Sequence, residues 1–179
     1  MADILLINPP EILGYYPPLG LCYLAAACEK SGFSVEILDM AIGNIGRQGM
    51  QKRIFISKPK VVGIYVSSTG LGLILPLIEN IRRVLPFVAI VVGGPHISAC
   101  PDVVNLLDAA YGFVGDAEIG FPKLCRFLIE KNGDLRNIEG LVWKSGQMLC
   151  LNPPQKDVDI DSFVFSNSIR FFFLLTRAR

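Results

Sequence analysis

Histidine is almost absent from this 179-residue chain, and its scarcity excludes several kinds of site. His96 is the only histidine, and none of the five cysteines forms a C-x-x-C pair, so a conventional zinc set cannot be assembled. No G-x-G-x-x-G follows the first apolar run, and no Walker sequence occurs. The usual fingerprints of dinucleotide and nucleoside triphosphate sites are therefore missing.

Charge is sparse and balanced. Seventeen lysines and arginines face sixteen aspartates and glutamates, scattered along the chain, which argues against a nucleic-acid-binding surface. The N-terminus has no basic segment or cleavage site for export, so we expect a cytoplasmic protein with reduced thiols. The most apolar window, residues 61–78, is interrupted at 67–70 and at Pro76, short of the ~20 residues that a membrane span needs.

Short apolar runs are abundant instead, since 51% of residues are hydrophobic and the mean hydropathy is +0.46. Such runs are typical of parallel strands buried on both faces. The expected strands cover residues 3–8, 33–39, 60–66, 87–92 and 110–115. The expected helices cover residues 19–31, 48–56, the segment after 70 up to about 85, 101–107 and 118–132.

Five βα units predict an α/β fold: a flavodoxin-like (Rossmann-like), doubly wound, parallel five-stranded sheet of order 2-1-3-4-5. Two further runs, 138–142 and 147–151, predict a C-terminal β-hairpin extension. We therefore expect a Rossmann-like domain over residues 1–135, the hairpin within 136–151, and a linker from residue 152 onward.

Candidate functional residues follow the strands, at the edge where ligands bind in open α/β sheets. The segments are Asn8-Pro9-Pro10, Ser67-Ser68-Thr69-Gly70, Gly93-Gly94-Pro95-His96 and Gly115-Asp116-Ala117-Glu118. Two successive glycines after a buried strand indicate a sharp turn or a close approach to the backbone. The edge is expected to bind something uncharged or of mixed charge, and large enough to need both glycines.

Each segment also has a simpler interpretation. The hydroxyls of residues 67–69 suit a polar ligand, but they equally suit an ordinary helix N-cap. Asp116 and Glu118 could bind a ligand hydroxyl or amide, or could stabilise a helix N-terminus through its dipole. His96 could be a metal ligand or a proton donor, although a single histidine cannot build a protein-only zinc or iron site.

Taken together, these segments resemble the N-terminal cobalamin (B12)-binding domain of the B12-dependent radical SAM proteins. The likeness covers residues 3 to about 165 and includes Tyr16-Pro17-Pro18-Leu19-Gly20-Leu21. The resemblance implies a corrinoid cofactor containing cobalt, with its corrin near residues 9–18. It also implies a nucleotide tail in a cleft beside the Ser/Thr loop and the Gly-Gly turn. The implied cofactor-binding residues are Asn8, Pro9, Pro10, Tyr16, Pro17, Ser67, Ser68, Thr69, Gly70, Gly93, Gly94, Pro95, His96, Gly115, Asp116 and Glu118.

The chain departs from the family pattern at two motifs, and each departure changes which cofactor ligands we expect. No Asp-x-His-x-x-Gly motif follows the first strand, so the resemblance implies base-off cobalamin without a lower histidine ligand, with His96 lining the site. No Cys-x-x-x-Cys-x-x-Cys occurs, so no iron–sulfur cluster is expected in this chain. Phe171–Leu175 is similar to the strand that would precede that motif. We therefore expect that this chain is a piece cut off before a radical SAM domain and that it is not catalytic alone.

Two other hypotheses stay open. A flavodoxin-like domain could bind FMN or a nucleotide instead of a corrinoid. Alternatively, the chain could bind no cofactor and serve as a docking scaffold for a separate radical SAM subunit.

Overall fold

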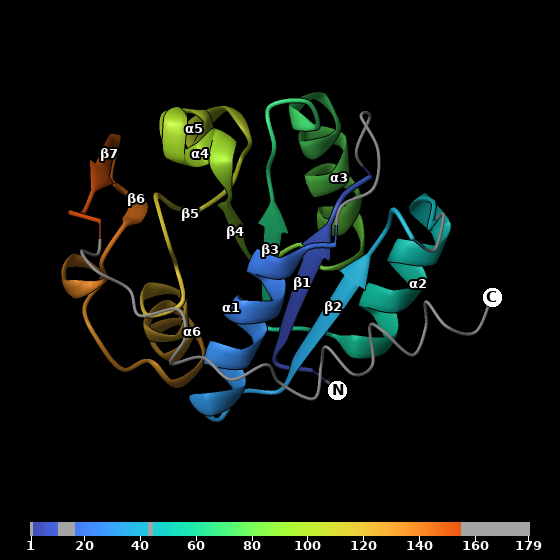
Figure 1. Cartoon of the computed structure of the whole chain (residues 1–179), viewed down its shortest axis with the longest axis horizontal. Helices are drawn as coiled ribbons and strands as arrows, with labels where there is room; N and C mark the ends of the chain where they lie inside the picture. The colour runs from blue at the N-terminus through green and yellow to red at the C-terminus, as the bar shows by residue number, and fades with distance from the viewer. Residues whose placement is uncertain (1, 11–16, 43–44, 155–179) are drawn as a thin grey trace.

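The structure is a computed structural model that describes residues 2–10, 17–42 and 45–154 (Figure 1). Its strands are β1 (Ile4–Asn8), β2 (Val35–Asp39), β3 (Val61–Tyr65), β4 (Ala89–Gly93), β5 (Tyr111–Phe113), β6 (Leu141–Ser145) and β7 (Met148–Leu151). Its helices are α1 (Leu19–Lys30), α2 (Arg47–Ser57), α3 (Leu71–Val84), α4 (Pro95–Ala99), α5 (Val103–Leu106), α6 (Gly120–Glu130) and a 3-10 turn at Leu135–Asn137.

The strands form one sheet of order β2-β1-β3-β4-β5-β6-β7. The first five are parallel, and β6 and β7 add an antiparallel hairpin at the β5 edge. The predicted flavodoxin-like order and the hairpin extension are therefore confirmed. Because all the parallel strands point the same way, the loops that follow them meet at one edge, at the top of Figure 1.

Helices cover both faces of the sheet, which explains the continuous apolar strands. One core cluster joins α1 and α6 to the sheet, and the other joins α2, α3, α4 and α5 to the opposite face. Gly63 allows α6 to approach closely, since a Cβ there would lie 2.8 Å from Leu6 and 3.4 Å from the Phe121 ring. Cys22, Cys28 and Cys125 are buried free thiols.

The hairpin begins later than the sequence predicts. Residues 138–140 do not belong to the strand, because the 3-10 turn precedes them and Gly140 has φ +68°. Asn152 fixes this arrangement. Its side-chain amide donates to the carbonyls of Leu135 and Ile138 at 2.6 and 2.8 Å, and its Oδ1 accepts from the Trp143 indole at 3.3 Å. The strand therefore starts at Leu141.

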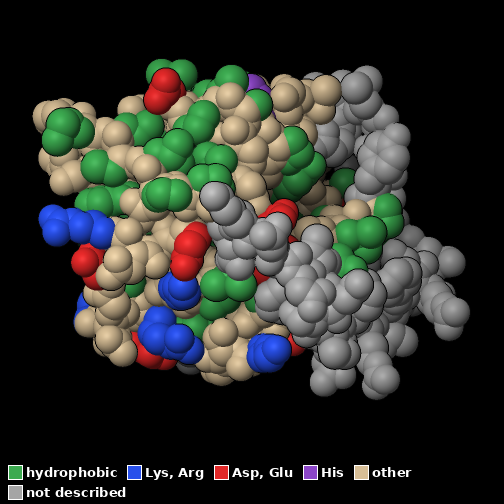
Figure 2. Space-filling view, turned by 60° about the vertical axis from the view of Figure 1, so that its left-hand side comes forward, with side chains coloured by type: hydrophobic (Ala, Val, Ile, Leu, Met, Phe, Trp, Pro, Cys, Tyr) green, Lys and Arg blue, Asp and Glu red, His purple; other side chains and the backbone are tan. Residues whose placement is uncertain are grey.

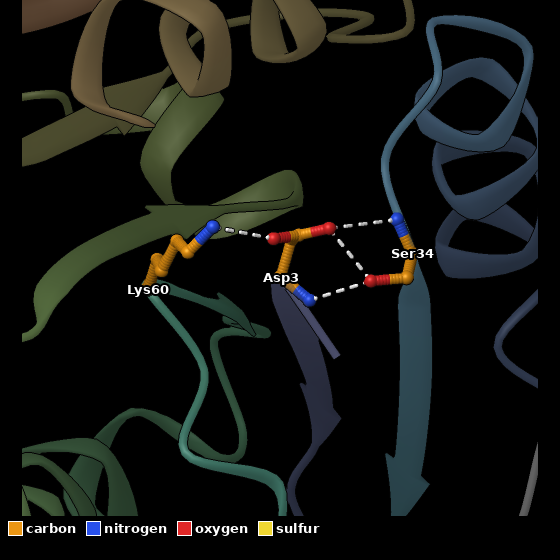
Figure 3. A network of polar contacts seen from close by, with 3 residues as sticks. All are labelled: Asp3, Ser34 and Lys60. Atoms are coloured by element: carbon orange, nitrogen blue, oxygen red, sulfur yellow. Dashed lines mark hydrogen bonds and ion pairs between the residues drawn. The ribbon is translucent and has the colours of Figure 1, made fainter. Parts of the chain in front are cut away.

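The opposite, amino-terminal edge of the sheet is held by a polar network (Figure 3). The Asp3 carboxylate accepts from Lys60 Nζ at 2.8 Å and from the Ser34 hydroxyl at 2.6 Å. These residues precede β1, β3 and β2, so the network joins the starts of three neighbouring strands. The hydrogen bonds from Lys60 and Ser34 lower the pKa of Asp3 to about 2.

Candidate functional site

The loops at the carboxyl edge are hydrogen-bonded to one another. The Val66 amide donates to the Gly93 carbonyl at 2.7 Å, and the His96 amide donates to the Val66 carbonyl at 3.2 Å. The Gly115 amide donates to Ser98 Oγ at 3.0 Å. Three of the four segments singled out in the sequence are therefore linked by hydrogen bonds. We call the edge formed by all the segments that follow strands β1 to β5 the carboxyl rim.

The sequence predicted that His96 lies in an open loop, but the structure places it in a helix. Pro95 occupies the first turn of the short helix α4, a position that proline favours, and His96 follows it. Its Nδ1 lies 3.0 Å from Ser68 Oγ, which links the β4–α4 and β3–α3 connections. The half-buried imidazole therefore positions Ser68 on the rim.

The three hydroxyl residues before α3 divide into two roles. Ser67 Oγ accepts from the Gly70 amide at 3.0 Å and lies 3.2 Å from Thr69 Oγ1. Ser67 therefore stabilises the turn that precedes α3, although the N-cap residue itself is Gly70 and has no side-chain cap. Ser68 and Thr69 are exposed, so their hydroxyls are the ones that a ligand can reach.

The two adjacent glycines serve different purposes. Gly94 has φ +112°, and a Cβ there would lie 2.9 Å from the Val66 carbonyl oxygen and 3.1 Å from the Tyr65 ring. Gly93 belongs to β4, and a Cβ there would meet only Phe113 Cβ at 3.9 Å. The missing side chain of Gly94 is thus required by the turn, whereas a methyl group at Gly93 would make only an ordinary van der Waals contact.

Two carboxylates follow β5. Asp116 is exposed, whereas Glu118 is half-buried and its Oε2 has no hydrogen-bond partner among the described residues. Burial raises the pKa of Glu118, and the nearby Asp116 raises it further. Glu118 is therefore more readily protonated than an ordinary glutamate and can act as a hydrogen-bond donor or acceptor.

At the β1 end of the rim, Asn8 and Pro9 are buried and Pro10 and Pro17 are exposed. Tyr16 lies outside the described residues. Asn8 pairs in register with Asp39, a buried residue that the sequence analysis did not select. Asp39 Oδ1 accepts from the Ala41 amide at 2.9 Å, while its Oδ2 is buried without a partner among the described residues. Asp39 could have been identified from the sequence, because it is the last residue of an expected strand, as Asn8 is.

The segments that form the rim contain no lysine or arginine, although the exposed Arg47 begins α2 at the same edge. These segments are residues 8–10, 39–42, 66–70, 93–96 and 114–119. In Figure 2, which includes the histidine near the top, the upper third of the visible face shows no blue side chain. Among the described residues, no group of three or more His, Cys, Asp or Glu side chains could hold a metal ion. The rim suits a largely uncharged organic ligand better than a phosphate-rich one.

A doubly wound sheet with such a rim defines a flavodoxin-like, ligand-binding α/β domain. The model of the B12 binding domain matches residues 10–125, and the chain belongs to this family.

Curated relatives and solved structures agree with that assignment. The chain is 28% identical to an uncharacterised methyltransferase of Pyrococcus horikoshii and to tryptophan 2-C-methyltransferase of Streptomyces laurentii, with 87% of this chain covered in each case. It spans only 35% and 28% of those proteins. The radical S-adenosylmethionine methyltransferase TsrM from Kitasatospora setae, with cobalamin and a [4Fe-4S] cluster bound, superposes with a TM-score of 0.76 at 26% identity, over 88% of this chain and 30% of that one.

The cobalamin-dependent S-adenosylmethionine radical enzyme OxsB shares the fold, with a TM-score of 0.76 at 18% identity, over 88% of this chain and 23% of that one. No described helix is long and apolar enough to cross a membrane.

The rim fits a corrinoid in three respects. Cobalamin is bulky and bears many neutral amide groups, and the rim segments offer exposed hydroxyls at Ser68 and Thr69 and no basic side chain. The missing side chain at Gly93 admits a group close to the sheet. The buried oxygen of Glu118, which has no partner among the described residues, leaves one polar group that a bound ligand could satisfy.

Proposed function

We propose that this chain binds cobalamin at its carboxyl rim. The observation that carries the proposal is the match of residues 10–125 to the B12 binding domain, together with the missing side chain at Gly93. The lack of lysine and arginine in the segments that form the rim favours cobalamin over FMN or a nucleotide, whose phosphates usually recruit basic side chains.

Within this proposal, the Gly93 backbone forms the floor against which the flat or bulky part of the cofactor lies. Ser68, oriented by His96, and Thr69 would hydrogen-bond to the polar periphery. Asn8, Pro9, Pro10 and Pro17 would lie on the β1 side of the ligand, and the Gly115–Glu118 segment on the β5 side.

The cobalt ion would receive no histidine from this chain. No histidine stands between β1 and α1, where the family pattern has the lower ligand, and the only histidine, His96, follows β4 instead. We therefore propose that the cofactor binds base-off, with its own nucleotide base displaced and no protein imidazole replacing it. Cobalamin, when bound, supplies methyl-transfer chemistry.

We further propose that the chain acts as the cofactor-binding part of a larger B12-dependent radical SAM methyltransferase. Supporting this, the chain aligns with only about a third of each related methyltransferase. By its resemblance to the family, the Phe171–Leu175 segment is expected to be the strand that begins the following domain. This segment lies outside the described residues.

A spectroscopic titration tests the binding proposal. The purified chain is titrated with hydroxocobalamin and methylcobalamin and then desalted, and the visible spectrum reports retained corrinoid and its base-on or base-off state. We expect about one equivalent to be retained in the base-off form. A protein that stays colourless contradicts the proposal, and a flavin-loaded preparation would replace it with the FMN hypothesis.

A graded series at Gly93 locates the site. Gly93→Leu should abolish retention because the leucine occupies the place of the ligand, whereas Gly93→Ala should reduce it only partly. Ser145→Leu is the matched control, since it adds the same side chain at an exposed position on the hairpin, away from the rim. Equal retention by Gly93→Leu and Ser145→Leu, with both proteins folded by circular dichroism, would place the ligand elsewhere.

A further inference from the structure

Three large apolar side chains are exposed at the amino-terminal edge of the sheet, opposite the carboxyl rim. Phe87 is 99% exposed, Phe55 is 65% exposed and Ile56 is 57% exposed. The cofactor proposal gives none of them a role. Exposed aromatic groups of this size are costly to leave in water and mark interaction surfaces when they gather.

Phe87 is held out into solvent by a rigid turn. Pro86 precedes it, and the Val88 amide donates to the Leu85 carbonyl at 3.3 Å, which closes a β-turn over these residues. The Arg82 guanidinium donates to the carbonyls of Pro86 and Val88, on either side of the phenylalanine. The aromatic ring therefore projects from a fixed backbone rather than from a loose loop.

Topology brings the three side chains to the same edge. Phe55 and Ile56 lie in the last turn of α2, just before β3, and Phe87 lies just before β4. These strands are hydrogen-bonded neighbours, with Val61 opposite Ala89, and α2 packs on α3. We call this surface, defined by Phe55, Ile56 and Phe87, the amino-edge patch.

The patch is bordered by positive charge. Four lysines and arginines, and no acidic residue, fall within residues 52–60, in the second half of α2 and the loop that leads to β3. Lys60 and Arg53 are paired with Asp3 and Glu36. Lys52 and Lys58 are exposed, and Lys58 Nζ lies 5.7 Å from the centre of the Phe55 ring. Aromatic groups flanked by lysines are the combination that binds the interface of an anionic bilayer.

We propose that the amino-edge patch docks this domain onto an anionic phospholipid surface. The Phe87 ring, which is almost fully exposed, can enter the headgroup region without shape complementarity. The exposed lysines supply attraction to the negatively charged lipids. Because the patch lies at the edge of the sheet opposite the carboxyl rim, docking by this edge leaves the rim accessible.

Vesicle co-sedimentation of the full chain tests this proposal. The probes are vesicles of equimolar phosphatidylglycerol and phosphatidylcholine, and vesicles of phosphatidylcholine alone. We expect the protein to pellet with the anionic vesicles, and less so at high salt. Phe87→Ser should weaken the partition by about tenfold or more, because one buried aromatic side chain is lost. Lys52→Glu should also weaken it.

Leu106→Ser is the matched control, since Leu106 is 75% exposed but lies on α5, outside the patch. It should leave vesicle binding unchanged, and Phe87→Ser should leave corrinoid retention and thermal unfolding unchanged. The proposal is overturned if the wild-type chain shows no preference for anionic vesicles. It is also overturned if Leu106→Ser reduces binding as much as Phe87→Ser does, because vesicle binding would then not depend on the patch.

Discussion

Replacing Gly94 with alanine should destabilise the fold far more than the same change at its neighbour Gly93. Gly94 adopts φ +112° and ψ −176°, a backbone conformation that is essentially restricted to glycine. An added Cβ would also lie 2.9 Å from the Val66 carbonyl oxygen, which accepts the His96 amide hydrogen bond. Relieving that contact moves the turn that joins β4 to α4.

The size of the effect follows from these two contributions. The backbone conformation costs an L-residue about 1–3 kcal/mol, and forcing a methyl group against a main-chain oxygen adds about 1 kcal/mol. We expect Gly94→Ala to lose about 2–4 kcal/mol of unfolding free energy. For Gly93→Ala, the single contact at 3.9 Å is ordinary van der Waals packing. The change there should stay within about 0.5 kcal/mol.

Urea unfolding, followed by far-UV circular dichroism, measures both variants. The Gly94→Ala midpoint should fall by roughly 1–2 M at an unchanged slope, while the Gly93→Ala midpoint should stay close to that of the unmodified chain. Similar midpoints for the two variants would refute the conclusion that the turn requires Gly94 but not Gly93.

Three further predictions concern residues away from the glycines. Asn152→Ala removes three side-chain hydrogen bonds and should cost about 2 kcal/mol, lowering Tm by about 4–8 °C; an unchanged Tm would argue against its role. Because the pKa of Asp3 is lowered from 3.8 to about 2, its contribution is present above pH 3.8 and lost as pH falls through about 2. Lys60→Met should therefore cost about 1 kcal/mol at pH 7, after allowance for solvent screening, and the difference should vanish in acid-unfolding curves below pH 2. Glu118 has a raised pKa, so its burial lowers stability as pH rises above its ordinary value of 4.5; Glu118→Gln should flatten the stability profile from pH 4.5 to 7, and an unchanged slope would contradict this.

Sequence patterning accounts for much of the fold because each parallel strand is a short apolar run punctuated by glycine, proline or polar residues. The β-branched runs before Ser67 and before Gly93 indicated two such strands, and the helical crossovers between them required a parallel arrangement. The sequence predicted the hairpin correctly but not the residue at which its first strand begins. Its first strand is set by the Asn152 side chain, a contact across several residues that no local pattern encodes.

The candidate site likewise has features that the sequence predicts and features that only the folded structure shows. The sequence itself determined that polar and glycine segments follow the strands, because strand direction alone places them at one edge. Only the tertiary structure decided that Ser68 pairs with His96 across two loops, and that the turn requires Gly94 but not Gly93. It also placed Asp39 beside Asn8 and Phe87 out in solvent. Local periodicity specifies which residues are buried in strands and helices, but contacts between distant segments depend on strand order and register, which exist only once the chain has folded.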